Sequence, residues 1–470
     1  MAQTRRDFLR NGACALGSMA LVSQIEKFGI VNALTPQAAT DYKALVCLFM
    51  NGGNDGNNML VSLDQYAQYS SARSTAQLAI PQASLLPVAP ASGGSYGFHP
   101  NMPEVKSLFD SGKLAVLCNN GPLVEPLTRT TYQNGTGKKP LQLFSHSDQV
   151  GSFQTSIADT VSQTGWAGRL ADKTALLNGA ATFPSNVSIA GINLFLTGVD
   201  TRQLAVSDSN TTLANVLVLS NAPGSPSTAE INSRLASFNE LRGYDNNFKL
   251  IKAASDTRTS AIQTDDALSN VSPTLNTPFP NPSTSISRQL LQVARMIKAS
   301  TDQSAGINMK RQVFFVQLGG FDTHSAQLNG QGTLLMQVSQ AISAFYNATV
   351  ELGLSDKVTL FTMSDFGRTL QPAGSGTAAV GSDHAWGNHH LIVGGAVLGR
   401  TLYGTYPNLA LGGPNDTDGG TAPRGRWIPT TSVEQYAATL ATWYGLSTAD
   451  LPAVFPLISR FPSANLGFLS

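Results

Sequence analysis

The fold is decided by a short apolar run that ends in a glycine-rich turn, KALVCLFMNGGNDG at residues 43–56. Residues 43–50 are almost continuously apolar, which is typical of a strand buried on both faces of a parallel sheet. The turn that follows contains three glycines and three polar residues. It predicts a tight connection at the carboxyl end of a buried strand.

The same pattern recurs along the chain. Further apolar runs end in turns rich in Asn, Gly or Asp, at residues 113–118, 311–318 and 357–363. Helical spacing of apolar residues flanks the 311–318 run, with Leu290, Val293, Ala294 and Ile297 before it and Leu335, Val338, Ile342 and Phe345 after it. Strands that alternate with helices predict an α/β fold, with a doubly wound, mostly parallel sheet and helices on both faces.

Three regions are expected from composition. Residues 1–39 form an export signal, and residues 40–470 form one α/β domain. Within that domain, residues 198–287 are rich in Ser, Thr, Asn and Pro and contain one or two helical patterns, such as the one at 231–241. We interpret this stretch as a polar helical insertion or cap.

Charge and hydropathy exclude some classes of protein. The 470 residues carry 30 basic and 29 acidic side chains, a net charge of +1, so no basic surface for nucleic acid is expected. A membrane-spanning helix needs about 20 apolar residues. No stretch after the signal meets that requirement, which predicts no stable membrane insertion of the mature chain.

The first residues predict export. Thr4 to Arg10 read TRRDFLR, in which Arg5 and Arg6 form a twin-arginine pattern ahead of a short apolar segment, residues 13–25. The alternative is an amphipathic first helix. The signal predicts the twin-arginine translocase as partner, a periplasmic or extracellular location, and cleavage near Ala33 or Ala39.

Three cysteines are present. Cys14 lies in the export segment, whereas Cys47 and Cys118 lie in apolar runs. An oxidising compartment permits a disulfide between the latter two, and buried free thiols are the alternative.

Histidines and aspartates gather after the predicted strands. Four of the six histidines fall between residues 322 and 390. In an open parallel sheet, ligands bind at the carboxyl ends of the strands. Carboxylates and neutral imidazoles suit Zn²⁺, Mn²⁺ or Mg²⁺. The candidate ligands of a divalent cation (Zn, Mn, Mg or Ca) are Asp322, His324, Asp365, Asp383 and His384. The alternative is that these histidines cap strands and bind backbone.

A second group surrounds His146. The stretch LFSHSDQ at residues 143–149 places Ser145 and Ser147 beside an imidazole, and Arg129 lies upstream. A hydroxyl, an imidazole and an arginine together suggest a nucleophile and an anion clamp. The alternative is a Ser N-cap at a helix start.

Several motifs together resemble a known family, the twin-arginine-exported proteins called domain of unknown function 1501. They are NGGNDG (51–56), LFSHSDQ (143–149), GWAGR (165–169), LGGFDTH (318–324), SDFGR (364–368) and DHAWGNHH (383–390) with Gly394-Gly395. The family is similar to the alkaline phosphatase and sulfatase superfamily. That resemblance implies a metal site at the carboxyl edge of the sheet.

The resemblance implies roles for individual residues and is partial. It implies an Asp near Asn51 or Asp55, ligands at Asp322, His324, Asp365 and His384, and a nucleophile at Ser145 or Ser147. Phe366 stands where the superfamily has a metal-ligating His. A single-metal site, or a site that has lost hydrolysis, is therefore expected rather than a two-metal site.

Two functions follow as hypotheses. The first is a metal-dependent hydrolase of phosphate or sulfate esters, in which the cation polarises a small anionic ester, Ser145, Ser147 or water attacks, and Arg129 or Arg368 clamps the anion. The second is a non-catalytic exported protein that binds a ligand or partner through the same fold.

Overall fold

A computed structural model describes residues 38–181, 183–213, 227–243, 264, 267–268, 274–279, 284–301, 307–374, 380–420 and 422–470. The predicted export signal, with Arg5 and Arg6, lies outside these residues, as do Cys14 and much of the predicted insertion. Among the described residues, no helix combines the length and apolar character needed to cross a bilayer.

The core of the molecule is a nine-stranded sheet. Its strands lie in the order β13 (Leu402–Gly404), β5 (Leu114–Gly121), β12 (Asn388–Val393), β9 (Val358–Ser364), β1 (Lys43–Met50), β8 (Arg311–Leu318), β6 (Asn186–Ser188) and β7 (Leu204–Ala205), and β14 (Thr431–Ser432) also pairs with β5. All pairings are parallel except those of β12, which runs antiparallel to β5 and β9.

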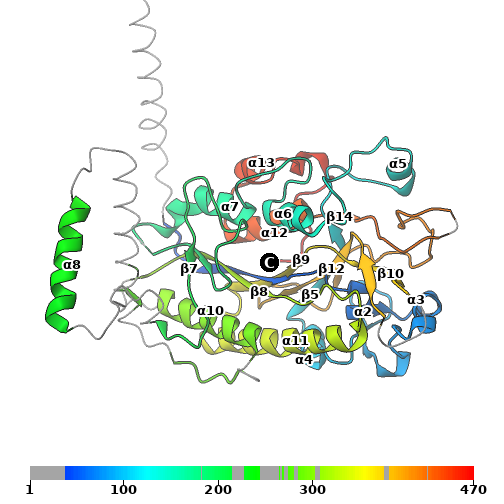
Figure 1. Ribbon diagram of the computed structural model, residues 1–470, viewed down its shortest axis with the longest axis horizontal. Coiled ribbons are helices and arrows are strands. Elements are labelled where there is room, and N and C mark those ends of the chain that lie inside the picture. Colours follow the sequence, from blue (N-terminus) through cyan, green and yellow to red (C-terminus); the bar gives the residue numbers. More distant parts are fainter. Residues whose placement is uncertain are drawn as a thin grey trace, which may run out of the picture.

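Helices cover both faces of the sheet (Figure 1). One layer consists of α4 (Pro103–Asp110), α10 (Ser285–Thr301) and α11 (Gln327–Glu351), and the other of α6 (His146–Thr155), α7 (Trp166–Thr174), α12 (Val433–Tyr444) and α13 (Leu451–Val454). The predicted fold class, a doubly wound and mostly parallel sheet, is confirmed. The helical spacings at 290–297 and 335–345 fall within α10 and α11.

Strand β1 shows why the sequence pattern specifies this architecture. Val46 and Leu48 pack into the core cluster that includes α10 and α11. Leu45 and Phe49 point the other way, into the cluster beneath α7 and α12. Because successive side chains alternate between faces, both sides of the strand must be apolar. Burying each large side chain contributes roughly 1.5–3 kcal/mol.

Smaller elements surround the sheet. They are a three-stranded sheet of β2 (Leu60–Ser62), β4 (Tyr96–Phe98) and β3 (Leu86–Val88), a β10 (Arg368–Pro372)–β11 (Ser382–His384) pair, and helices α2 (Gly56–Met59), α3 (Tyr66–Arg73), α5 (Arg129–Gln133) and α8 (Thr228–Gly243). Within the predicted insertion at 198–287, β7 belongs to the edge of the main sheet and α8 contains the predicted helix; the bounds of the insertion stay a prediction.

The two cysteines of the domain are buried and free. Cys47 lies in β1 and Cys118 in β5, with no disulfide between them. Burial raises the pKa of both thiols. The sequence left open a disulfide between Cys47 and Cys118 or two buried free thiols, and the structure has the free thiols.

Strands β1, β8 and β9 end together. Met50, the last residue of β1, pairs with Leu318 at the end of β8 and with Ser364 at the end of β9. The turns that follow these three strands therefore share the carboxyl edge of the sheet, where open α/β sheets bind their ligands.

Candidate metal centre

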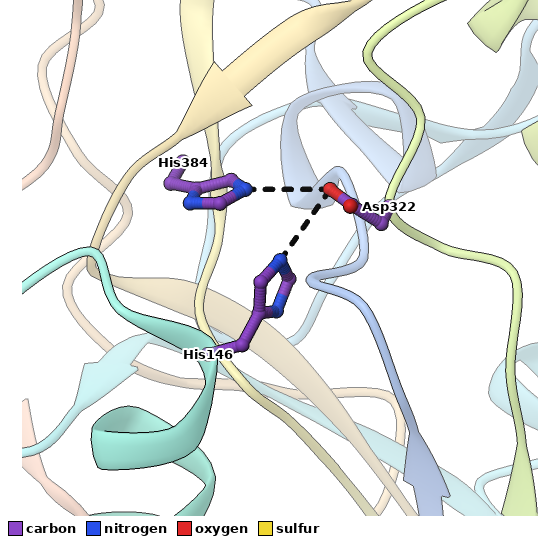
Figure 2. A group of neighbouring side chains, drawn as sticks. All are labelled: His146, Asp322 and His384. Carbon is purple, nitrogen blue, oxygen red and sulfur yellow. Dashed lines mark hydrogen bonds and ion pairs between the residues drawn. The ribbon is translucent and has the colours of Figure 1, made fainter.

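The side chains of the centre come from four segments that meet at this edge. Asp322 and His324 follow β8, Asp365 directly follows β9, and His384 is the last residue of β11. His146 is the first residue of α6, after Ser145 at the N-cap. Figure 2 shows His146, Asp322 and His384 pointing toward one another.

A close turn allows Asp322 to reach this position. Gly52 follows β1 with φ +114°, a conformation that L side chains rarely adopt. A Cβ atom there would lie 2.4 Å from the Asp322 amide nitrogen. The first glycine of the turn after β1 is thus required for the backbone contact between the β1 and β8 turns.

Two imidazoles and one carboxylate oxygen, of His146, His384 and Asp322, face a common point, and the His324 imidazole lies beside the carboxylate. Asp322 Oδ1 lies 3.1 Å from His324 Nε2, 3.3 Å from His384 Nε2 and 3.5 Å from His146 Nε2. The Nε2 atoms of His324 and His384 are 3.0 Å apart. One ligand atom from each of His146, Asp322 and His384 lies within 4.8 Å of the others.

An oxygen atom lies behind each imidazole, within hydrogen-bond distance for His146 and His384. His146 Nδ1 lies 2.7 Å from Asp365 Oδ2, and His384 Nδ1 lies 2.8 Å from the Phe144 carbonyl oxygen. His324 Nδ1 is 3.5 Å from Asp383 Oδ1. Donation from Nδ1–H to oxygen leaves the lone pair on Nε2, the arrangement that histidine ligands of metals have in proteins.

These residues fit a divalent cation. In a tetrahedral zinc site with bonds of about 2.0–2.1 Å, ligand atoms are separated by about 3.3 Å, close to the separations around Asp322 Oδ1. His146 Nε2 is buried and has no hydrogen-bond partner within the described structure. A buried nitrogen left without a partner is costly unless a ligand satisfies it.

Arg368 governs the charge of the centre. Desolvation raises the pKa of Asp322, but the hydrogen bond and charge of Arg368 outweigh it and leave that pKa below its usual value. Desolvation lowers the pKa of His384, despite the opposing hydrogen bond to Phe144, and the charge of Arg368 acts in the same direction. An ionised carboxylate and a neutral imidazole are the forms that bind a cation.

The structure brings together three of the five predicted ligands, Asp322, His324 and His384. Asp365 is fully buried and accepts hydrogen bonds through both oxygens, from the Gly52 amide (2.9 Å) and from His146. Asp383 contacts His324 and forms an ion pair with Arg424 (2.5 Å). Both carboxylates thus contact the Nδ1 atoms of histidines, His146 for Asp365 and His324 for Asp383, and do not face the common point.

The predicted catalytic residues have the following places. Ser145 Oγ and Ser147 Oγ donate to Asp148 Oδ2, at 2.6 and 3.1 Å. Arg129 donates to the carbonyl oxygens of Gly412 and Asp418. The catalytic roles of these residues stay predictions.

Arg368 was predicted as an anion clamp. Its guanidinium is fully buried and donates to Asp322 and to the carbonyl oxygens of Gly52, Gly53, Phe321 and Ser382. These hydrogen bonds hold the guanidinium against the loops that surround the centre. The proposed clamp role stays a prediction.

Sequence reasoning did not assign His146 as a ligand. It considered this imidazole as a partner of the neighbouring serines. A usable signal was present, since His146 is one of only six histidines and begins a helix in a motif of the resembled family. Its approach to Asp322 depends on how α6 packs over the sheet, which local sequence does not encode.

Phe366 fills the space beside the two histidines. Its ring is fully buried, with its centroid 4.7 Å from that of His146 and 4.6 Å from that of His384. The position at which the superfamily resemblance expects a further histidine therefore supplies an apolar wall.

Fold and site together define an α/β protein with a candidate metal centre at the carboxyl edge of its sheet. The chain belongs to the family described as protein of unknown function (DUF1501), whose model matches residues 42–413. This confirms the family resemblance seen in the sequence. No curated protein matches the chain.

Several solved structures can be superposed on most of this chain, but with low similarity in structure and in sequence. They include a sulfatase from Pseudoalteromonas sp. (12% identity, 82% of this chain and 68% of that one, TM-score 0.30). The lipoteichoic acid synthase LtaP from Listeria monocytogenes has 7% identity, coverage of 90% and 79%, and a TM-score of 0.33. The wild-type alkaline phosphatase PafA has 10% identity, coverage of 70% and 64%, and a TM-score of 0.27.

Proposed function

We propose that this protein is an exported, metal-dependent hydrolase of phosphate or sulfate esters. One observation supports the proposal above the others. The Nε2 atoms of His146 and His384 converge with the Asp322 carboxylate at the carboxyl edge of the sheet, His324 Nε2 lies 3.1 Å from the same carboxylate, and an oxygen atom lies behind each imidazole. Such an arrangement is hard to explain as strand capping, which needs no converging lone pairs.

The residues of the centre have separate tasks in this proposal. His146, Asp322 and His384 hold the cation, and His324 Nε2 lies 3.1 Å from Asp322 Oδ1. A bound divalent cation supplies Lewis-acid polarisation of an ester oxygen and stabilises in-line displacement. Phe366 excludes water from one side of the centre because its buried ring packs against two of the ligands.

Two partly exposed arginines lie beside the centre as hydrogen-bond donors for an anionic substrate. Arg426 donates from Nε to the His384 carbonyl oxygen (3.0 Å), and its guanidinium lies over the Phe144 ring at 4.9 Å. Arg424 pairs with Asp383 beside His324. Arg426 also pairs with Asp418 at 3.1 Å, so the two arginines contribute charge-assisted hydrogen-bond donors rather than a net positive field. Ser145, directly before the ligand His146, is the proposed nucleophile, with Ser147 or water as alternatives.

Metal content and turnover of the purified mature protein test the proposal. We expect one divalent cation per chain and metal-dependent hydrolysis of an aryl phosphate or aryl sulfate. Asp322→Asn and His384→Gln should lose both metal and turnover. His99→Gln is the matched control, because His99 is a buried histidine away from the centre whose Nδ1 accepts from the Asn101 amide.

The outcomes separate the two hypotheses. Absence of stoichiometric metal, with thermal stability unchanged by chelator, would overturn the metal centre. Stoichiometric metal without turnover of either ester would favour the non-catalytic ligand-binding protein. Equal loss in the His99→Gln control would mean that the variants report misfolding.

Export by the twin-arginine translocase is part of the proposal. It rests on Arg5 and Arg6 in the TRRDFLR stretch. Replacing both by Lys should retain the chain in the cytoplasm, as measured by cell fractionation, while Arg10→Lys in the same stretch should leave export unchanged. Export of the double variant at the normal level would refute this route.

A further inference from the structure

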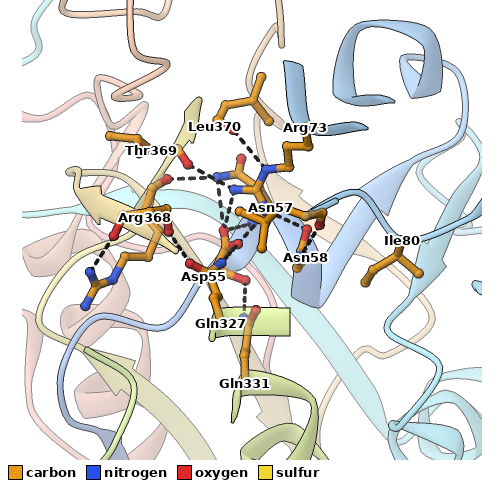
Figure 3. Close-up of polar contacts among 12 residues, drawn as sticks. Asp55, Asn57, Asn58, Arg73, Ile80, Gln327, Gln331, Arg368, Thr369 and Leu370 are labelled. Carbon is orange, nitrogen blue, oxygen red and sulfur yellow. Dashed lines mark hydrogen bonds and ion pairs between the residues drawn. The ribbon is translucent and has the colours of Figure 1, made fainter. Parts of the chain in front are cut away.

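A buried polar network joins helices α2, α3 and α11 to strand β10 (Figure 3). Its centre is Asp55, at the N-cap of α2, whose carboxylate accepts from Arg73 Nη1 at 2.5 Å and Nη2 at 3.1 Å. Gln327, at the start of α11, donates from Nε2 to Asp55 Oδ2 at 2.5 Å. Asp55 is 1% exposed, and Arg73 and Gln327 are fully buried.

One arm of the network holds strand β10. Arg73 donates to the carbonyl oxygens of Leu370 and Thr369, both at 2.9 Å. Asn57, which also donates to Asp55, donates to the Arg368 carbonyl oxygen at 2.8 Å. Three consecutive carbonyl groups of β10 are thus bound by side chains of the β1–α3 region.

A second arm holds strand β11. Ser382 Oγ donates to the side-chain oxygen of Gln327 at 2.5 Å, and its hydroxyl is fully buried. In the next residue, the Asp383 amide donates to Thr369 Oγ1 at 3.1 Å. The two strands are therefore bound to the network and to each other.

The network ends at the candidate ligands. His384 lies two residues after Ser382 and pairs with Arg368 across the β10–β11 strands. Arg368 donates to the Ser382 carbonyl oxygen at 3.0 Å and also to Asp322. Movement of Ser382 would therefore change the separation of His384 Nε2 and Asp322 Oδ1.

Stability alone is a poor explanation for these contacts. Removing an Asp–Arg pair from water is costly, and apolar residues of similar volume often stabilise a protein as well or better. What a fully satisfied buried polar network supplies is one defined geometry. That geometry is what a metal centre needs from the residues around its ligands.

We propose that Asp55, Arg73, Gln327 and Ser382, here called the Asp55 network, are positioning residues of the metal centre. The Asp55 network holds His384 Nε2 at 3.3 Å from Asp322 Oδ1, a separation that suits two ligands of one cation. It contacts neither the cation point nor a substrate, and acts through β10 and β11. This inference rests on the proposed metal centre.

Cobalt binding by full-length mature protein tests it. Co²⁺ is titrated at 25 °C into the wild type, Ser382→Ala and Gln327→Met, and both the affinity and the visible absorption bands are recorded. We expect the dissociation constant to rise by roughly 10–100-fold and the bands to shift, as when supporting residues of metal ligands are lost. Near-ultraviolet circular dichroism verifies that each variant is folded.

Ser339→Ala is the matched control. Ser339 is a fully buried serine on α11, like Gln327, and its hydroxyl donates to Glu104 at 2.7 Å and accepts from the Val105 amide. It should lose stability without change in cobalt affinity or spectrum. If Ser382→Ala does not fold, Gln327→Met decides the question, because either variant breaks the same link.

The failures are distinguishable. No cobalt binding by the wild type would overturn the proposed function itself. Normal binding and spectra in both variants, with a wild type that binds, would overturn only the positioning role. Equal weakening in Ser339→Ala would show that lost stability, not lost geometry, lowers the affinity, and would also overturn it.

Discussion

Asp365 is a fully buried carboxylate that the sequence predicts as a ligand and that the structure places behind His146. Both of its oxygens already accept hydrogen bonds, from the Gly52 amide and from His146 Nδ1. Its position after β9 follows from the strand pattern. Which nitrogen or cation its oxygens face depends on the α6 helix, which is distant in sequence.

We expect Asp365→Asn to weaken metal binding by roughly 10–100-fold, because an amide holds the Nδ1–H tautomer of His146 less firmly than a carboxylate. Competition titration with a coloured chelator measures the affinity. Asp208→Asn serves as a control, since Asp208 pairs with Arg288 away from the centre. Unchanged affinity in Asp365→Asn would show that His146 is not a ligand or needs no support.

Gly53 makes a second prediction at this scale. Its φ is +85°, and an added Cβ would lie 2.5 Å from two ring carbons of Phe366. Gly53→Ala should destabilise the protein by about 2 kcal/mol or more, since backbone strain of about 1–3 kcal/mol adds to the displaced ring. Gly112→Ala is the control and measures the cost of backbone strain alone. Gly112 also has a positive φ, +71°, but an added Cβ there would have no atom within 4 Å. Equal urea midpoints for the two variants would contradict the contact with Phe366.

At the scale of elements, the regular strands and helices were the easiest to predict. Strands β1, β5, β8 and β9 and helices α10 and α11 follow directly from continuous apolar runs and helical spacing. The β10–β11 pair was not predicted, although it carries His384. Its two strands are short and most of their residues are polar, so they lack the apolar pattern of a buried strand. The side chains that bind β10 are Arg73 and Asn57, which lie about three hundred residues away in the sequence.

Helix α12 carries a buried acid with a testable pH dependence. Desolvation raises the pKa of Glu434 from 4.5 to about 8, although Oε1 accepts from the Leu457 amide. The native state therefore keeps a proton that the unfolded chain releases above pH 4.5. Stability from this group is complete below pH 4.5 and is lost as the pH rises through about 8.

We accordingly expect Glu434→Gln to be more stable than the wild type at pH 9, on the order of a few kcal/mol. The difference should shrink toward pH 4.5, where both side chains are neutral in the native state. Urea unfolding at a series of pH values measures it. A difference independent of pH would mean that Glu434 is ionised in the native protein.

At the scale of the whole molecule, buried histidines in the central sheet limit acid stability. Desolvation lowers the pKa of His389 to about 4 and that of His390 to about 3, both from 6.5. The unfolded chain takes up protons below pH 6.5 that the native protein cannot. Stability therefore falls as the pH decreases from 6.5 toward 4.

His390→Phe should reduce this acid loss by about 1.4 kcal/mol per pH unit, the contribution of one proton. His390 stacks on Tyr436 and its two ring nitrogens have no hydrogen-bond partner in the described structure, so an aromatic ring can replace it. Unfolding free energies between pH 6.5 and 4 test the slope. Parallel curves for variant and wild type would contradict a buried neutral His390.

The sequence by itself determined the family, the doubly wound sheet and the edge at which polar residues gather. These follow from local periodicity and from short motifs, because each strand and helix must bury its own apolar side chains. Asp322 and His324 could be named because they follow a strand that ends at this edge, and His384 because it precedes the apolar run that forms β12. The tertiary structure alone decided that His146 joins them, that Asp365 and Asp383 support imidazoles, and that Asp55 and Arg73 belong to the surroundings of the centre. These assignments depend on the packing of α6, α3 and the β10–β11 pair against the sheet. The periodicity of a segment depends only on which of its own faces is buried, so it does not indicate which distant segments pack against it.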